Sequence, residues 1–423
     1  MKNTSSELVV IGGGAAGLMA AGMAAERGLS ATVLEKTRYT ARKLGITGKG
    51  RCNVTNDAAP REVIANIPGN GKFLYSAVTE FPPRAVMELF ERLGVPLKVE
   101  RGNRVFPVSD RAQDICEALR RFCRSGGVRI VHERATDILT GDGHVTGVRT
   151  AAGEYPTANA LIATGGASYP VTGSDGDGYE LARRLGHRII TPRPSLVPLE
   201  AEGDICGRMQ GFSLKNVGLR VEDKNGKRIY EDFGEMLFTH FGVSGPMVLS
   251  ASAHMRDFES NRYTMYIDLK PALDEEMLDR RILRDFDKYR NRDFQNALAD
   301  LAGRSMIPVL VELSGIPPET KVNSVTREQR RGLVELFKAF PVHITGARPI
   351  EEANVTAGGV DVRQIQPRTM ESKLVRGLYF AGEVMDLDAY TGGFNLQIAW
   401  SSAYMAARSI GKEQYGKTYR NRH

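Results

Sequence analysis

The sequence has few of the residues that build disulfides or metal centres: among its 423 residues are four cysteines and seven histidines. Cys52, Cys116, Cys123 and Cys206 show no C-x-x-C spacing and are too sparse for a secreted disulfide scaffold, so we expect reduced thiols. Cys116 and Cys123 are spaced as a pair of small core residues on one helix face. The histidines show no ligand spacing, and we therefore expect no metal site.

Long apolar runs are absent as well. No stretch reaches the roughly 20 apolar residues that a membrane-spanning helix needs, and residues 1–6 are short and polar. We therefore expect no membrane span and a cytoplasmic location. The composition, 42% hydrophobic and 25% charged, is typical of a globular protein long enough for several domains.

A strong excess of one charge is also missing, because the net charge is only +7. Basic residues gather at 38–51, 280–292 and 412–422, where they could favour anionic substrates, phosphates or nucleic acid. Solvated helix faces explain most of this charge, and no aromatic residues are interleaved with it. We therefore expect a small-molecule substrate rather than a nucleic-acid partner, and the sequence leaves the oligomeric state open.

A glycine-rich turn stands near the start of the chain. Residues 7–11 form an apolar segment typical of a strand, and Gly12, Gly14 and Gly17, in G-x-G-x-x-G spacing, lead into a small-residue helix over 15–27. Gly12 permits the tight turn, Gly14 lets a pyrophosphate approach the backbone, and Gly17 lets the helix pack closely on the strand. The N-terminus of the helix then faces the anion.

A second strand over 30–34 completes the unit and ends on Glu35. A carboxylate at this place accepts hydrogen bonds from the adenosine ribose hydroxyls and disfavours a 2′-phosphate. The alternative is a glycine-rich corner that binds nothing, but strand, helix and acid occur together here. The pattern therefore predicts a dinucleotide site.

Three later glycine-rich segments, Thr164–Gly166, Gly382–Glu383 and Gly392–Phe394, favour FAD over NAD. An NAD enzyme usually joins one βαβαβ core to a separate catalytic domain, whereas the length of FAD requires contacts from several segments. Backbone N–H groups of Gly392–Phe394 can face the flavin edge that becomes negative on reduction, although an ordinary turn before a core helix is the alternative. A second G-x-G-x-x-G is absent, so any NAD(P)H would bind only transiently as a co-substrate.

The order of the segments predicts an α/β fold in three stretches. Residues 1–193 are expected to form the first part of a Rossmann-type FAD-binding domain, 194–343 an inserted β-rich and helical substrate domain, and 344–423 the second part of the FAD-binding domain. The proline-rich segment 191–198 marks the first crossing.

Two details of this organisation can be tested separately. Residues 128–132 are expected to form a small meander with the strands 135–140 and 144–150. In the insert, the charged residues 275–301 are expected to form one helical stretch.

The run Ala41–Asn56, ARKLGITGKGRCNVTN, resembles the signature of the BaiN-like, aminoacetone-oxidase-like bacterial flavoproteins, which are NAD(P)/FAD-dependent oxidoreductases. Ala41 stands where the signature has glycine and Thr47 where it has serine, and neither change threatens FAD binding. Further blocks match the family in the same order: Arg104–Pro107, Ala163–Gly166, Leu237–Pro246 and Gly392–Gln397.

The resemblance implies a noncovalent FAD in a Rossmann-type domain of the glutathione-reductase-like kind, interrupted by a β-barrel-like insert with a helical subdomain. Family members reduce enone-type double bonds in bile-acid intermediates or oxidise aminoacetone. We expect hydride transfer through flavin N5, and the leading function is NAD(P)H-dependent reduction of a small enone-like substrate. The alternatives are a flavin oxidase of an amine or aminoketone that uses O₂, an FAD-dependent RNA-modifying enzyme, and a non-enzymatic flavin-binding protein.

Two side chains are assigned catalytic roles. His240, in the glycine- and proline-marked turn 239–246, is the candidate proton donor or substrate contact, although it could simply pack. Arg51 is expected to contact an anion or a flavin carbonyl, and Cys52 is expected to pack rather than to act as a redox thiol. The residues expected to bind the cofactor are Gly12, Gly14, Ala15, Ala16, Gly17, Glu35, Lys36, Lys43, Gly50, Arg51, Cys52, Asn53, Thr164, Gly165, Gly382, Glu383, Gly393, Phe394, Asn395 and Leu396.

Overall fold

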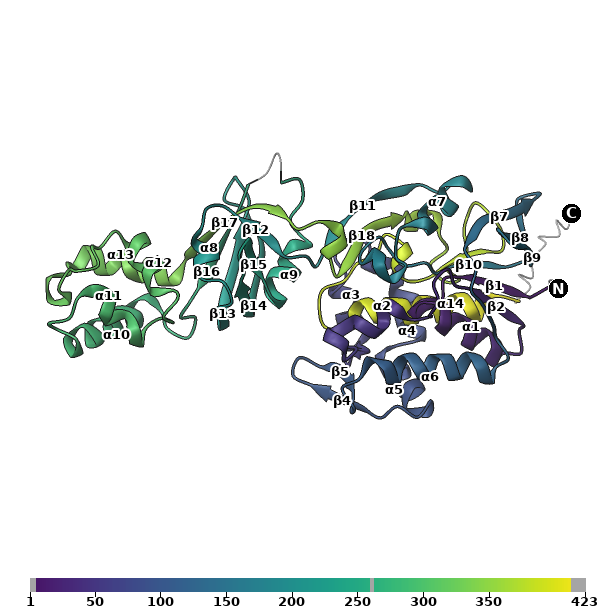
Figure 1. The fold of residues 1–423 in the computed structure, drawn as a ribbon, viewed down its shortest axis with the longest axis horizontal. Coiled ribbons are helices and arrows are strands. Elements are labelled where there is room, and N and C mark those ends of the chain that lie inside the picture. Colours follow the sequence, from purple (N-terminus) through teal and green to yellow (C-terminus); the bar gives the residue numbers. More distant parts are fainter. Residues whose placement is uncertain (1–4, 259–261, 412–423) are drawn as a thin grey trace, which may run out of the picture. The chain divides into compact units, whose positions relative to one another are not determined.

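The computed structural model describes residues 5–258 and 262–411 (Figure 1). The chain divides into two compact units: Met1–Arg193 together with Val355–His423, here called the Rossmann unit, and Pro194–Asn354, here called the barrel unit. The chain returns to the Rossmann unit at Val355, later than residue 344, because a strand of the barrel unit still occupies Phe340–Ala347. The basic segment 412–422 lies outside the described residues.

A five-stranded parallel sheet forms the centre of the Rossmann unit, in the order β19-β10-β1-β2-β6. Its buried apolar strands are short, and the C-terminal part of the chain supplies one edge by pairing Leu378 with Ala160. All-parallel strands need helices on their faces, which explains why the sequence alternates strands and helices here. The strands are β1 (Leu8–Ile11), β2 (Ala31–Leu34), β6 (Arg129–Val131), β10 (Ala160–Ile162) and β19 (Leu378–Phe380).

Helix α14 (Phe394–Ser409) packs beside α1 (Ala15–Glu26) in the core of this unit (Figure 1). Trp400 of α14 is fully buried, and its indole N–H donates to the carbonyl of Val54 at 2.8 Å. Its ring meets Phe90 edge-on, with 5.5 Å between the ring centroids. Burial of such a side chain contributes about 1.5–3 kcal/mol to the free energy of unfolding. Helix α14 therefore anchors the segment around Val54.

The expected meander is wrong in one strand. Residues 129–131, as β6, extend the parallel sheet beside β2, because α6 (Ala112–Ser125) and the turn after it return the chain parallel to β2. The antiparallel meander consists of the three strands that follow: β7 (Ala135–Gly141), β8 (His144–Thr150) and β9 (Gly153–Pro156).

The remaining elements of the Rossmann unit are short. They include two small sheets, β3-β5-β4 and β11-β18. Their bounds are α2 (Arg42–Ile46), β3 (Thr55–Asn56), α3 (Pro60–Ala65), α4 (Tyr75–Glu80), α5 (Pro83–Arg92), β4 (Leu97–Glu100), β5 (Arg104–Pro107), α7 (Asp177–Arg184), β11 (Ile189–Ser195) and β18 (Val355–Val360).

The barrel unit is a closed six-stranded antiparallel barrel with a helical subdomain, as the expected fold class requires. The helices of the subdomain, α10 to α13, lie between the last two strands in sequence. The single helical stretch expected over 275–301 is interrupted, because α10 ends at Lys288 and α11 begins at Phe294. The bounds are β12 (Leu199–Ala201), α8 (Ile205–Arg208), β13 (Ser213–Glu222), β14 (Arg228–Phe238), β15 (Gly242–Ser244), α9 (Pro246–Ser252), β16 (Tyr263–Asp268), α10 (Glu275–Lys288), α11 (Phe294–Ala297), α12 (Ile307–Ser314), α13 (Arg327–Lys338) and β17 (Phe340–Ala347).

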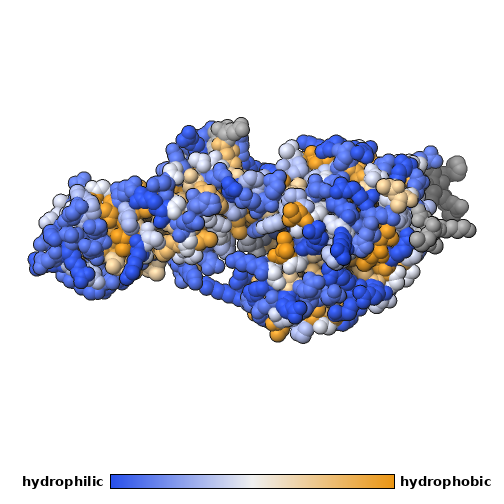
Figure 2. Space-filling view, viewed as in Figure 1, coloured by the Kyte–Doolittle hydropathy of each residue, from blue (hydrophilic) through white to orange (hydrophobic). Residues whose placement is uncertain are grey.

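The surface is mainly polar on the face drawn in Figure 2, where apolar residues lie in small separate patches. Within residues 5–258 and 262–411, none of the helices has the length and apolar character needed to cross a membrane.

Candidate flavin site

The turn between β1 and α1 has the geometry that its three glycines predict. Gly12 has a φ of +104°, and a Cβ on Gly17 would lie 1.9 Å from the carbonyl oxygen of Gly12, so helix and strand touch through backbone alone. A Cβ on Gly14 would meet no atom within 4 Å. No side chain of the described residues caps the N-terminus of α1. Gly14, Ala15 and Ala16 thus surround an open N-terminus that can bind an anion.

Glu35 lies at the end of β2 beside this turn. Its side chain is 8% exposed, and its two carboxylate oxygens accept the N–H groups of Gly13 at 2.8 Å and Thr37 at 2.7 Å. These two bonds fix the orientation of the carboxylate. Each oxygen still has a free lone pair for a ligand hydroxyl.

Lys36, the next residue, is held by carboxylates of the segment before α7. Its ammonium donates to Asp177 at 2.7 Å and also to Asp175, which Arg134 contacts at 2.8 Å. Burial raises the pKa of Asp177 above its usual value. Lys36 therefore links β2 to the loop that follows β10, where Thr164 and Gly165 lie.

A second ion pair joins the segment after β2 to the segment after β19. The Lys43 ammonium donates to the two carboxylate oxygens of Glu383 at 3.0 and 2.9 Å and to the Ser168 hydroxyl at 2.7 Å. Glu383 also accepts the backbone N–H of Thr356 at 2.8 Å. Gly382, the residue before Glu383, has a φ of +75° and lies close to α1, because a Cβ on it would be 3.0 Å from that of Ala16.

The run from Thr47 to Asn53 is a loop in which several residues have positive φ. Lys49 and Cys52 have φ values of 59° and 60°, and Gly50 has 83°. Cys52 is completely buried, and burial raises the pKa of its thiol to about 12. The thiol is therefore protonated at neutral pH and unsuited to redox chemistry.

Four buried polar side-chain atoms of the Rossmann unit have no hydrogen-bond partner among the described residues: Oδ1 of Asp177, the Tyr179 hydroxyl and, in two residues expected to line the cofactor loops, Oδ1 of Asn53 and Oγ1 of Thr164. A buried polar group without a partner costs free energy, typically about 1–3 kcal/mol. Asn53 and Thr164 belong to the expected cofactor site. Their unpaired atoms are the places where a polar ligand would restore the missing bonds.

The N-terminus of α14 meets the Asn53 segment directly. Gly393 has a φ of +101°, and its Cβ would lie 2.4 Å from the Thr55 carbonyl group and 2.9 Å from Oδ1 of Asn53. As at α1, side-chain capping is lacking among the described residues, so N–H groups of the first turn, from Phe394 to Leu396, remain for a ligand. The Asn395 carboxamide instead closes its own turn by exchanging hydrogen bonds with Ala389 at 2.8 and 2.9 Å.

Several residues that support these contacts are not among the residues expected to bind the cofactor. Thr55 donates to Gln397 at 2.5 Å, and Gln397 in turn donates to the carbonyl of Phe81 at 2.9 Å, which holds β3 against α14. Thr356 accepts the N–H groups of Ala167 at 2.9 Å and Ser168 at 3.1 Å. The only sequence signal is proximity of Thr55 and Gln397 to the glycine-rich blocks, because their partners are distant in the chain.

The two expected catalytic residues belong to different units. The Arg51 guanidinium is engaged by carboxylates of Glu100 and Asp110. His240 belongs to the barrel unit, in the turn between β14 and β15, where its side chain is exposed and its ring meets Phe241 edge-on at 5.0 Å. The expected cofactor residues thus belong to the Rossmann unit, and His240 belongs to the barrel unit.

A flavin dinucleotide fits these features. The open space at Gly14, the oriented carboxylate of Glu35, the uncapped α1 and α14, and the unpaired oxygens of Asn53 and Thr164 all belong to one unit. A Rossmann sheet together with four separate segments that could contact the cofactor is typical of an FAD-binding protein. Here an insertion divides the FAD-binding domain into two parts of the sequence.

The chain belongs to the HI0933-like family, since residues 6–409 match the model described as HI0933-like protein Rossmann domain. The resemblance carried by Ala41–Asn56 is thereby confirmed, and the protein is an FAD-dependent oxidoreductase of this family.

Known relatives match almost the whole chain. The 3-dehydro-bile acid delta(4,6)-reductase of Clostridium scindens is 30% identical over 95% of this chain and 98% of its own length. The ribosomal RNA dihydrouridine synthase of Haemophilus influenzae is 31% identical over 96% and 99%. The solved structure of 3-ketosteroid delta1-dehydrogenase from Sterolibacterium denitrificans superposes with a TM-score of 0.51 at 12% identity, covering 96% of this chain and 99% of that one, and shows the fold alone.

Proposed function

We propose that this protein reduces a carbon–carbon double bond conjugated to a carbonyl group, with FAD held noncovalently in the Rossmann unit. The turn at Gly12, Gly14 and Gly17 and the N-terminus of α1 bind the pyrophosphate. Glu35 accepts the adenosine ribose hydroxyls. Because the carboxylate is already oriented by the N–H groups of Gly13 and Thr37, little ordering is needed when the ribose binds.

The remaining segments hold the other end of the cofactor. Glu383, kept in place by Lys43, and the unpaired oxygen of Thr164 offer acceptors for ribityl hydroxyls. Asn53 and the first turn of α14, from Phe394 to Leu396, offer an acceptor and N–H donors to the ring system. The positive end of the α14 dipole stabilises negative charge on the reduced ring, which favours two-electron reduction.

The observation that carries the proposed reaction is the chemistry shared by two relatives with unlike substrates. Their names specify a Δ4,6-reductase of 3-dehydro-bile acids and a synthase of dihydrouridine. A 3-oxo-Δ4 steroid and the uracil ring both contain a C=C bond conjugated to C=O. FAD held at this site and reduced by an electron donor would supply the hydride that adds to the β-carbon of such a bond, and a proton from an acid or water would complete the reduction at the α-carbon.

NAD(P)H is the proposed electron donor. The chain has no second G-x-G-x-x-G for a resident nicotinamide dinucleotide, so the donor binds, reduces the flavin and leaves before the substrate enters. His240 is the proposed proton donor or substrate contact. Its exposed ring is in keeping with a role that needs access from solvent.

RNA is the second candidate substrate, and the charge distribution favours it. Among the described residues, the Rossmann unit carries 30 Lys and Arg against 24 Asp and Glu, whereas the barrel unit carries 22 against 24. The basic excess therefore lies on the unit with the flavin site, which suits a polyanion that must bring a base to the flavin.

Anaerobic reduction of the purified protein tests the proposal at the donor step. Bleaching of the flavin absorbance by NADPH or NADH without oxygen is the expected result. Reduction of the flavin by an amine or aminoketone, with hydrogen peroxide formed on admission of air, would show that the protein is an oxidase and not a reductase. Retention of rRNA at low salt and its loss at high salt, followed by uridine reduction, would select the RNA substrate.

A further inference from the structure

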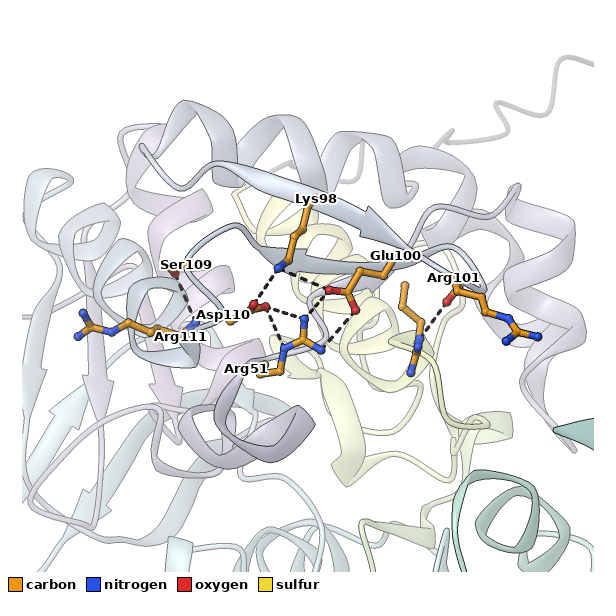
Figure 3. A network of polar contacts seen from close by, with 8 residues as sticks. Arg51, Lys98, Glu100, Arg101, Ser109, Asp110 and Arg111 are labelled. Atoms are coloured by element: carbon orange, nitrogen blue, oxygen red, sulfur yellow. Dashed lines mark hydrogen bonds and ion pairs between the residues drawn. The ribbon is translucent and has the colours of Figure 1, made fainter. Parts of the chain in front are cut away.

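Arg51 is bonded to carboxylates of the β4–β5 hairpin and of the segment that follows it (Figure 3). Its Nε and Nη2 donate to one oxygen of Asp110 at 2.9 and 2.6 Å, and its Nη2 and Nη1 donate to the two oxygens of Glu100 at 2.5 and 3.3 Å. Its guanidinium carbon lies 4.0 Å from the centroid of the Phe106 ring. The hairpin β4–β5 and the residues after it thus contact both the N–H donors and the π-surface of the Arg51 guanidinium.

The backbone that carries Arg51 is strained. Lys49 and Cys52 lie in the left-handed region, which costs a non-glycine residue about 1–2 kcal/mol each. The backbone bonds within the loop include Cys52 N–H to Thr47 O at 3.0 Å and Arg51 N–H to Gly48 O at 3.3 Å. Such a conformation persists only when its surroundings enforce it, and the side chain of Arg51 is one tie between this loop and the rest of the unit, beside the bonds of Val54 to Val105 and to Trp400.

The two residues after Arg51 enter the candidate site. Cys52 is buried, and Asn53 places its unpaired Oδ1 within 2.9 Å of the position of a Cβ on Gly393, at the N-terminus of α14. With a single buried residue between Arg51 and Asn53, a shift of the arginine is transmitted to the carboxamide. Displacements of about 1 Å are enough to change the energetics of a reactive site by large factors.

We propose that Arg51 is a positioning residue: its contacts with Glu100, Asp110 and Phe106 hold the Gly48–Asn53 loop so that Asn53 faces the flavin ring system. This replaces the expectation that Arg51 touches an anion or the flavin itself. The inference rests on the proposed flavin site, but not on the substrate reduced. Because the ion pairs are partly exposed, with Arg51 34% accessible, they contribute little to global stability.

The test uses three variants of the FAD-loaded protein. Arg51→Met removes the cation, and the double variant Glu100→Gln with Asp110→Asn removes the negative charge of its two partners, which Lys98 shares, without touching the loop. Arg104→Met is the matched control, because Arg104 is exposed, its guanidinium carbon lies 6.0 Å from the centroid of the same Phe106 ring, and its Nε donates to the backbone carbonyl of Arg101. The measured quantities are the dissociation constants of oxidised and reduced FAD, whose ratio sets the midpoint potential, and amide exchange over residues 47–53.

A positioning role predicts that Arg51→Met and the carboxylate variant change that ratio in the same direction, by about 5- to 10-fold, and speed amide exchange in the loop. Combining Arg51→Met with the carboxylate variant should change the ratio little more than either does alone, because both remove the same interaction. Arg51→Lys should recover part of the effect, and Arg104→Met should resemble the wild type. A change confined to Arg51→Met would show direct contact with the flavin, and a lower melting temperature with an unchanged ratio would show a purely structural role. If no variant binds FAD and the wild type does not either, the flavin site itself fails.

Discussion

Asn53 and Gly393 are packed so closely that no side chain fits between them: a Cβ on Gly393 would lie 2.9 Å from Oδ1 of Asn53. This contact joins the loop after α2 to the N-terminus of α14, two segments that are far apart in the sequence. It brings an unpaired acceptor beside unused backbone donors. The pairing of acceptor and donors in one place is what suits the site to a flavin ring, which presents both kinds of group.

Two glycines of the β1–α1 turn should respond differently to alanine. Gly14→Ala should fold with a melting temperature near the wild-type value in the absence of FAD, because its Cβ meets no protein atom within 4 Å, yet bind FAD at least about 10-fold more weakly. Gly17→Ala should destabilise folding by about 1–3 kcal/mol or more, because its Cβ would collide with the Gly12 carbonyl. Chemical denaturation and FAD titration of both variants measure this contrast. Unchanged FAD binding in Gly14→Ala would contradict a pyrophosphate site at the β1–α1 turn.

Glu35→Gln and Glu35→Ala should weaken FAD binding by about 1–3 kcal/mol, since a charged acceptor for the ribose hydroxyls is lost. The flavin released from wild-type protein by heat should be FAD and not FMN, because FMN lacks the adenosine that this carboxylate contacts. Isothermal titration and chromatography give the two answers. Glu133→Gln, which removes a carboxylate bonded to Thr150 at 2.6 Å, is the control.

The four cysteines should be inert in the folded protein. All are buried, and burial raises the pKa of the Cys52 thiol to about 12 and that of Cys116 to about 11. Thiolate should thus be scarce even at pH 9, and alkylation should be at least about 100-fold slower than in the unfolded chain. Iodoacetamide labelling followed by mass spectrometry measures the rates. Rapid labelling of Cys52 at neutral pH would reopen a redox role for it.

His240→Ala should slow substrate turnover by about 10²-fold while FAD content and the flavin spectrum stay at wild-type values. It belongs to the barrel unit, whereas the expected cofactor residues belong to the Rossmann unit. His343→Ala, another exposed histidine of the barrel unit, is the matched control. Single-turnover reoxidation of the reduced flavin by substrate isolates the step. Full activity in His240→Ala would remove this residue from the site.

The parts of the fold that sequence predicts are those determined by neighbours in the chain. The β1–α1–β2 unit is local, and the spacing of its glycines and acid specifies it. The placement of β6 depends on pairing Thr32 with Arg129, which no local pattern marks. A short apolar strand after a helix was therefore assigned to the wrong sheet.

The candidate site shows the same limit. Lys43 can be selected from its motif, but its partner Glu383 lies 340 residues further along the chain. Arg51 was expected to meet a ligand because an arginine in a glycine-rich loop often does. Its carboxylate partners lie 49 and 59 residues away, on a hairpin and turn that carry no motif for binding arginine. Only the tertiary structure reveals that the donors of Arg51 are already engaged.

The central claim is that reduced flavin in this protein passes hydride to a carbon–carbon double bond conjugated to a carbonyl. The most direct measurement mixes anaerobic, reduced protein with a 3-oxo-Δ4 steroid and, separately, with a uridine-containing rRNA fragment, and follows flavin reoxidation together with the product mass. The account predicts reoxidation by at least one of them, with a product heavier by two hydrogens, and no reoxidation by the saturated analogue. Flavin that stays reduced with both substrates and is reoxidised only by oxygen would contradict it.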